Sequence, residues 1–200
     1  IYRYYRLTSE IKALISLTVP ILIAQLAYSS MGFVDAIMVG RVSAHELAAI
    51  ALGTSVWIPL LLLMNGVLLA TTPKVAKCYG AGKDPEIGPL VHQALWLAIV
   101  VGIANAVDLT LIAPPVLHQM GVDADLAQTT IRYLHGVAFG FPSVALYQVL
   151  RCMSDGLSRP KPSMVIGLTA LTINVPIAYS FIYGKLGLPP MGAIGCGWAT

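Results

Sequence analysis

Five long stretches of the chain contain no Asp, Glu, Lys or Arg. They cover residues 13–34, 47–73, 87–107, 133–150 and 162–184, and a sixth charge-free run extends from 186 to 200. A helix needs about 20 mostly apolar residues to cross the hydrocarbon core of a bilayer. We therefore predict an all-α polytopic membrane protein, a bundle of about six transmembrane helices of which the sixth is truncated.

Turn and cap residues around these runs set the expected helix bounds. The predicted helices cover about 10–39, 45–73, 87–113, 125–152 and 161–184, with the start of a sixth at about 193–200. Four of them contain an internal proline: Pro20, Pro59, Pro142 and Pro176. Proline removes one helical hydrogen bond and bends the axis. Several proline-kinked helices favour a protein that changes shape over a static membrane anchor.

Composition supports the same class of protein. Hydrophobic residues make up 57% of the chain and charged residues only 10%, whereas a soluble domain carries about 25% charged residues. This excludes a soluble enzyme, a nucleic-acid-binding protein and a disordered chain.

The distribution of Lys and Arg predicts the orientation in the membrane. One side of the predicted bundle holds nine of them: Arg3, Arg6, Lys12, Lys74, Lys77, Lys83, Arg151, Arg159 and Lys161. The other side holds Arg41, Arg132 and Lys185. Positive residues accumulate on the cytoplasmic side of membrane proteins, so the N-terminus is expected in the cytoplasm. The connections, including a predicted outer loop at 114–128, are too short to hold a soluble domain.

Asp35 is the outstanding candidate for function. It lies in the outer half of the first predicted span, between apolar residues on both sides. A carboxylate at mid-membrane costs about 2.5–3.5 kcal/mol on insertion scales, so it is retained where it has a function. Burial favours the protonated form of a carboxyl group, which suits a group that loads and releases protons. The alternative is an interfacial Asp that reaches headgroup water.

Two further polar residues are candidates for the same cavity. Tyr28 shares a helical stripe with Met31 and Asp35, although it is equally suited to packing as an ordinary aromatic residue. Asn174 precedes Pro176 by two residues, next to a carbonyl that proline leaves without a donor. It is suited to coordinating a cation or to joining two helices, and the sequence does not distinguish the two.

No motif predicts an enzyme, a metal site or a cofactor. His45-Glu46 begins like H-E-x-x-H but lacks the second His, and residues 80–84 lack the other residues of a P-loop. Cys78, Cys152 and Cys196 contain no C-x-x-C pair. We expect no enzymatic activity, no cofactor and no bound metal.

The segments around these residues resemble a known family. They are 31–40, 42–43 and 47–49; 72–77 and 80–82; 150–151, 155–156 and 161–167; and 174–176, 183–184 and 195–200. Their order and spacing are similar to the N-terminal lobe of NorM-type transporters, members of the multidrug and toxic compound extrusion (MATE) family. Arg41, Trp57 and the ending Gly195–Thr200 look most similar to pseudomonad members.

The resemblance implies an efflux antiporter of two six-helix lobes in the bacterial inner membrane, which by alternating access exchanges H⁺ or Na⁺ for amphiphilic cationic drugs and dyes. It implies a cation-coupling and substrate cavity around Asp35 and Asn174, with Thr200 as a weaker candidate for its lining. Membrane lipids are the expected surroundings, and a monomer is expected once the second lobe is present.

Two departures from the family pattern affect these expectations. The second lobe, with its acidic residues, is absent from the chain. Ala178 occupies a position where relatives often have Asn or Asp, which removes an oxygen ligand for sodium and favours protons. The alternatives are a lipid-linked precursor flippase of the same superfamily and a membrane protein with a role other than transport. A flippase cavity should hold several cationic residues, and no Lys or Arg lies within the five charge-free spans.

Overall fold

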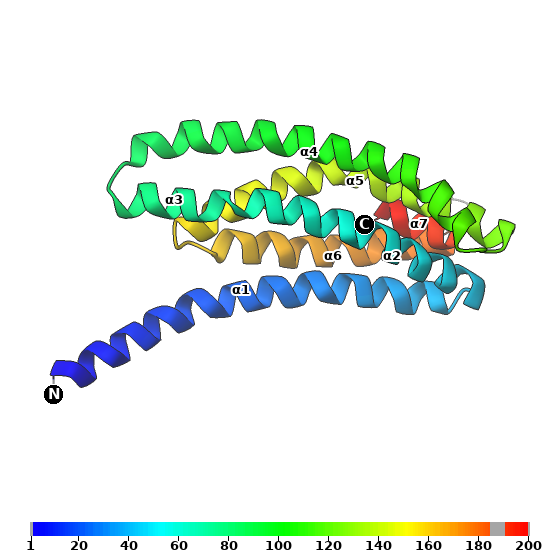
Figure 1. The fold of residues 1–200 in the computed structure, drawn as a ribbon. Helices are drawn as coiled ribbons and strands as arrows, with labels where there is room; N and C mark the ends of the chain where they lie inside the picture. Colours follow the sequence, from blue (N-terminus) through cyan, green and yellow to red (C-terminus); the bar gives the residue numbers. More distant parts are fainter. Residues whose placement is uncertain (1, 185–190, 200) are drawn as a thin grey trace.

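The computed structural model describes residues 2–184 and 191–199, with side chains described from residue 10 onward except at Ala13. This part of the chain is helical and contains no β-strand (Figure 1). The helices are α1 (Tyr2–Gly40), α2 (Ala44–Leu69), α3 (Thr71–Gly80), α4 (Asp84–Gln119), α5 (Ala124–Gly156), α6 (Lys161–Tyr183) and α7 (Gly192–Ala199). The predicted all-α fold is therefore confirmed.

Within the part of the chain that the structure describes, four helical stretches are long and apolar enough to cross a membrane. They are Glu10–Gly40, Ala44–Gly80, Asp84–Gln119 and Lys161–Tyr183. Helix α5 is not among them, although its 33 residues would extend about 50 Å at 1.5 Å per residue. It carries more polar side chains than its neighbours, and it lies in the middle of the bundle against α2, α3, α4, α6 and α7. Thr130 is one polar residue of α5 that is buried among its neighbours. The crossing of the membrane by α5 stays a prediction.

Two of the expected boundaries were wrong. The helical stretch predicted at 45–73 continues to Gly80 and is interrupted only at Ala70, between the end of α2 at Leu69 and the start of α3 at Thr71. The predicted outer loop at 114–128 is helical over its first part, because α4 continues through Pro114 and Pro115 to Gln119. Leu117 is fully buried, and this anchoring in the core, with the helix-compatible φ of proline, explains why α4 does not end there.

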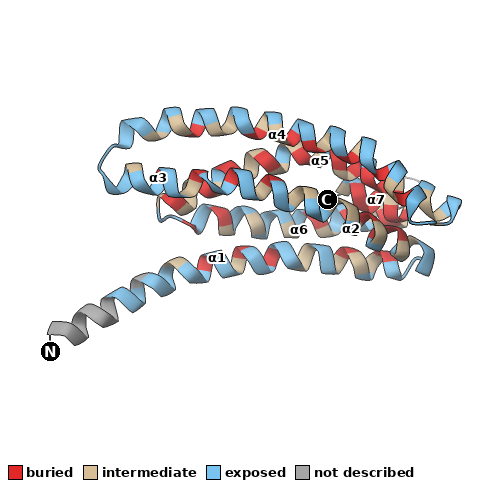
Figure 2. Cartoon of the chain, in the orientation of Figure 1, coloured by how far each residue is buried: buried red, intermediate tan, exposed pale blue. Residues whose placement is uncertain are grey.

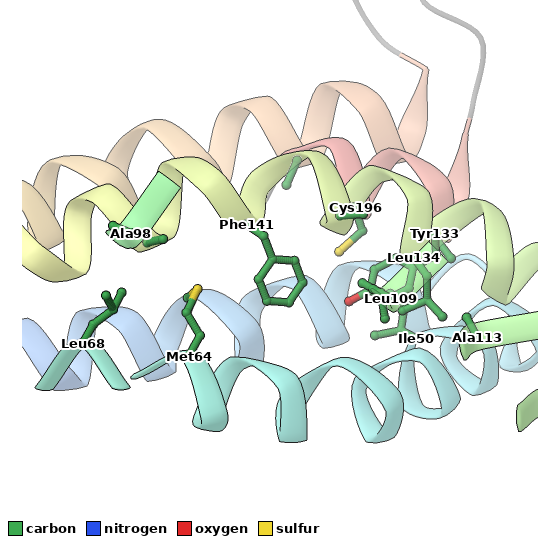
Figure 3. Packing of buried hydrophobic residues seen from close by; sticks show 14 of the residues in the cluster. Ile50, Met64, Leu68, Ala98, Leu109, Ala113, Tyr133, Leu134, Phe141 and Cys196 are labelled. Carbon is green, nitrogen blue, oxygen red and sulfur yellow. The ribbon is translucent and has the colours of Figure 1, made fainter. Parts of the chain in front are cut away.

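The buried residues gather along α5 and α7, whereas the outer faces of the surrounding helices are exposed (Figure 2). Met64 of α2 lies on the side of Phe141 of α5, and Leu109 of α4 and Leu134 of α5 belong to the same buried cluster (Figure 3). Large apolar side chains such as Phe33 and Leu111 are about two-thirds exposed. In a membrane protein these outward residues are the surface that contacts lipid.

Glycines allow the central helices to approach closely. A Cβ atom on Gly102 of α4 would lie 2.8 Å from Cα of Pro142 on α5. A Cβ atom on Gly136 of α5 would lie 2.9 Å from the carbonyl carbon of Gly197 on α7. Membrane helices associate through such small residues because lipid provides no hydrophobic drive for helix association.

The two ends of the bundle differ in charge. The turns 81–83 and 157–160 lie at one end, which we call the basic end. The turns 41–43 and 120–123 lie at the other, which we call the opposite end (Figure 1). At the opposite end His45 Nε2 lies 3.4 Å from Asp125 Oδ2, so the first residues of α2 and α5 are close together.

Glu46 of α2 holds the N-terminus of α7. Its Oε2 accepts a hydrogen bond of 2.6 Å from the backbone N–H of Ala193, and Gly192 leaves room for the carboxylate because a Cβ there would lie 2.6 Å from Oε2. A negative charge at a helix N-terminus interacts favourably with the helix dipole. The carboxylate therefore links two helices that are far apart in sequence.

Replacing Glu46 by Ala should lower the stability of the protein. Loss of a charge-assisted hydrogen bond costs about 1.5–3 kcal/mol, and Glu46→Gln should cost less because the amide oxygen still accepts. The measurement is thermal unfolding of the purified full-length protein in detergent. Glu86→Gln is the matched control, since Glu86 pairs with Lys83 at an exposed turn. Equal melting temperatures for Glu46→Ala and Glu86→Gln would contradict this prediction.

Candidate functional site

Asp35 lies on the inner face of α1 and is 4% exposed. It borders an open cavity of about 500 Å³ lined by α1, α2, α5 and α7. The lining consists of Gln25, Tyr28, Ser29, Met31, Gly32, Asp35, Ala36, Leu47, Ile50, Ala51, Thr54, Trp57, Ile58, Tyr133 and Cys196. The expectation that the carboxylate is buried inside the bundle agrees with this position.

Trp57 and Tyr133 form an aromatic wall of the cavity. Trp57 Nε1 donates to the Tyr133 hydroxyl at 3.3 Å, which joins α2 to α5. Gly53, one turn before Trp57, makes room for the Tyr133 ring, since a Cβ there would lie 2.6 Å from Cδ1 of the ring. The hydrogen bond and the glycine together hold both aromatic side chains beside the carboxylate.

The lining has the chemistry of a site for an amphiphilic cation. Asp35 is the only carboxylate among the described residues that line the cavity, and they include no Lys or Arg. The remaining wall is largely apolar and aromatic. Ligand sites commonly combine an apolar wall with a few polar groups that fix orientation, and aromatic faces attract cations. When Asp35 is ionised, it supplies the one negative charge of the described lining.

Tyr28 lines three neighbouring cavities of the bundle. It lines the Asp35 cavity, a small recess next to Phe141, and a second large cavity. Met31 and Asp35 lie on the same lining, so the stripe expected from helical spacing faces one cavity. Tyr28 is thus a boundary residue rather than a packed core residue, and 46% of it is exposed.

The second large cavity, of about 420 Å³, lies closer to the basic end. Gln25 and Tyr28 line both cavities. Arg151 of α5 donates from Nη2 to Gln25 Oε1 of α1 at 3.3 Å. Its Nε lies 4.0 Å from Asp155 Oδ2, at the i,i+4 spacing that favours a local ion pair. A polar chamber therefore adjoins the Asp35 cavity along α1.

Asn174 does not line the Asp35 cavity. It is buried between α6 and α7, where its Nδ2 donates to the carbonyl of Ala199 at 3.1 Å. Its buried Oδ1 accepts no hydrogen bond from the residues that the structure describes. The structure thus shows the joining of two helices at this position. Helix α7, which accepts the hydrogen bond from Asn174, also contributes Cys196 to the cavity. Thr200, the weaker candidate, lies outside the described residues.

Several lining residues were missed by the sequence reasoning. Gln25 and Thr54 are polar residues within apolar spans, and that signal was available. Trp57 and Tyr133 were not recognisable as a pair, because 76 residues separate them. In residues 2–184 and 191–199, no group of three or more His, Cys, Asp or Glu side chains could hold a metal ion.

Comparison with known proteins assigns the chain to a family. A family model described as MatE matches residues 20–180. The chain belongs to the MatE family. It is 54% identical over 198 residues to the multidrug resistance protein PmpM of Pseudomonas aeruginosa, which agrees with the resemblance to pseudomonad members. It is 47% identical over 191 residues to the probable multidrug resistance protein NorM of Mannheimia succiniciproducens. These alignments cover 99% and 96% of this chain but only 42% and 41% of the relatives.

Solved structures show the same fold. A MOP superfamily transporter from Pyrococcus furiosus is similar with a TM-score of 0.85 at 20% identity, over 94% of this chain and 41% of that one. A MATE structure in complex with MaD5 gives a TM-score of 0.86 at 20% identity, over 94% and 42%. The chain thus spans less than half the length of the relatives that it matches, and it is a multi-pass membrane protein of transporter fold.

Proposed function

We propose that this chain is the N-terminal lobe of an efflux antiporter that exchanges H⁺ for amphiphilic cationic drugs. The observation that carries the proposal is the buried Asp35 carboxylate, the one acidic group in the described lining of an apolar and aromatic cavity. The names of the relatives, which are multidrug resistance proteins, support the same substrate class.

Asp35 performs the exchange through competition between a proton and a drug. The ionised carboxylate holds the cationic group of the drug while Trp57 and Tyr133 contact its apolar part. Protonation removes the charge, and the drug then leaves. Each ligand therefore weakens the binding of the other, as an exchanger requires. The internal prolines allow the lobe to change shape between the two states.

Two observations favour H⁺ over Na⁺ as the coupling ion. Sodium, a hard cation, needs several oxygen ligands around it, as calcium does. Ala178 contributes no side-chain oxygen and is fully buried. Asn174 directs its amide nitrogen to α7 and does not line the cavity. The flippase alternative requires cationic residues in the cavity, and the described lining contains none.

We also propose that the N-terminus is cytoplasmic and that the membrane is the bacterial inner membrane. The excess of Lys and Arg at the basic end supports this orientation. The opposite end of the bundle then faces outward, and the Asp35 cavity lies toward that side. The complete transporter functions as a monomer, because the second lobe supplies the other wall of the pathway.

A coupling experiment tests this function. We expect the full-length protein in liposomes to transport ethidium when a pH gradient is imposed without sodium. Collapse of the pH gradient with an ionophore should return ethidium movement to the rate of protein-free liposomes. Ethidium fluorescence inside the liposomes gives the rate. Transport that begins only after a sodium gradient is added would reject H⁺ as the coupling ion, and no transport under either gradient would reject the substrate class.

A further inference from the structure

A recess of about 210 Å³ lies between α1 and α6 at the opposite end of the bundle, separate from the Asp35 cavity. It is lined by Val34, Ile37, Met38, Arg41, Tyr179 and Tyr183. Residues 34, 37, 38 and 41 share one face of α1 and the turn that follows it. That face lies beside α6 (Figure 1), whereas Asp35 borders the cavity toward α2.

The charge and the apolar side chains of the recess are arranged along the membrane normal. Arg41 immediately follows the last residue of α1, and Tyr183 is the last residue of α6, so both lie where the helices reach the membrane interface. Val34 is seven residues deeper, or roughly 10 Å along the helix. The recess therefore has a cationic rim at the interface and an apolar floor toward the hydrocarbon core.

Arg41 is available to an external anion. Its guanidinium makes no ion pair or hydrogen bond with any residue that the structure describes. Arg41 is also one of the few positive residues at this end, whereas most Lys and Arg residues lie at the basic end. A guanidinium presents a planar set of donors that matches a phosphate group.

The two tyrosines give the rim a defined shape. Tyr183 donates from its hydroxyl to the carbonyl of Met38 at 3.0 Å. The Tyr179 and Tyr183 rings lie with centroids 4.9 Å apart. Tyrosine is favoured at the level of lipid headgroups, and basic pockets between membrane helices bind such headgroups.

We propose that this recess binds one anionic phospholipid from the leaflet at the opposite end, the outer leaflet in the proposed topology. The phosphate pairs with Arg41 beside the tyrosines, and an acyl chain lies along Ile37 and Val34. The bound lipid bridges α1 and α6 next to the hydrogen bond from Tyr183 to Met38, one turn from Asp35. It therefore holds the outer end of α1 against α6 and stabilises the position of the carboxylate.

Native mass spectrometry of the delipidated full-length protein tests this site. We expect one phosphatidylglycerol to bind with higher affinity than phosphatidylcholine. Arg41→Gln should weaken that first binding event about tenfold or more, as loss of a charge-assisted hydrogen bond implies, and Arg41→Lys should weaken it less. Ile37→Trp, which fills the apolar floor, should weaken it as well. Arg132→Gln is the matched control, because Arg132 is near the same end but does not line the recess.

Each other outcome overturns the proposal. Equal binding of the two lipids, or unchanged binding in Arg41→Gln, would mean that Arg41 meets only bulk water or that the second lobe covers it. Unchanged binding in Ile37→Trp would remove the recess from the site. Displacement of the lipid by millimolar inorganic phosphate would make a free anion the occupant instead. The readout is binding alone, so its failure is independent of any failure of drug transport.

Discussion

Asp35→Asn in the full-length protein is expected to reduce proton-driven ethidium efflux to the rate of protein-free liposomes. The amide has the size of the carboxyl group, so the cavity keeps its shape. It carries no charge to hold a cationic drug, and it cannot bind and release a proton near neutral pH. Because Asp35 is the only carboxylate in the described lining, no neighbouring residue there replaces it.

Drug affinity should change together with transport in this variant. In the wild-type protein, ethidium binding should tighten as the pH rises, because deprotonation of Asp35 creates the charge that holds the dye. Asp35→Asn should bind the dye roughly ten- to hundredfold more weakly, the loss expected for one charge-assisted contact. The pH dependence of the binding should also disappear. Fluorescence titration of the detergent-purified protein at several pH values measures both effects.

The matched control is Asp108→Asn, since Asp108 is an exposed carboxylate on α4 outside the cavity lining. It should leave efflux and dye affinity unchanged. Asp35→Glu should keep part of both, because the carboxylate is retained on a longer side chain. Proton-driven efflux at the wild-type rate in a folded Asp35→Asn protein would remove Asp35 from the coupling mechanism.

Sequence patterns were informative where geometry follows from one helix. The 3.6-residue repeat places Tyr28, Met31 and Asp35 on one face, and the structure brings all three to the same cavity. The i,i+4 spacing of Arg151 and Asp155 likewise favours the ion pair that the structure shows. Such relations need only the geometry of a single helix, which is the same in every context.

Relations between helices could not be predicted in this way. The cavity wall depends on Trp57 reaching Tyr133 and on Gly53 making room for the ring, which requires the packing of α2 on α5. The direction of the Asn174 amide depends on α7, which supplies the carbonyl of Ala199. Proline rules alone also failed at Pro114, where burial of the following turn keeps α4 helical. In each case a tertiary contact decides what the local sequence leaves open.

Gly197→Ala should lower the free energy of unfolding more than a methyl group added at any other glycine discussed above. A Cβ at Gly197 would lie 2.6 Å from the carbonyl oxygen of Tyr133, a backbone atom of α5 that has no rotamer to change. The added methyl group must therefore push α7 away from α5. Overpacking of this kind costs about 1–3 kcal/mol. The free energy of unfolding, measured by denaturant titration of the purified full-length protein, is the direct test.

The same displacement should reach the functional cavity. Tyr133 of α5 and Cys196 of α7 both line it. Moving α7 away from α5 should therefore widen the cavity and weaken dye binding. Gly140→Ala on α5 is the control, because a Cβ there meets no atom within 4 Å. That substitution should be neutral or stabilising, since Ala favours a helix by about 1 kcal/mol over Gly. If Gly197→Ala were as stable as Gly140→Ala, the close contact between α5 and α7 would not exist in the membrane.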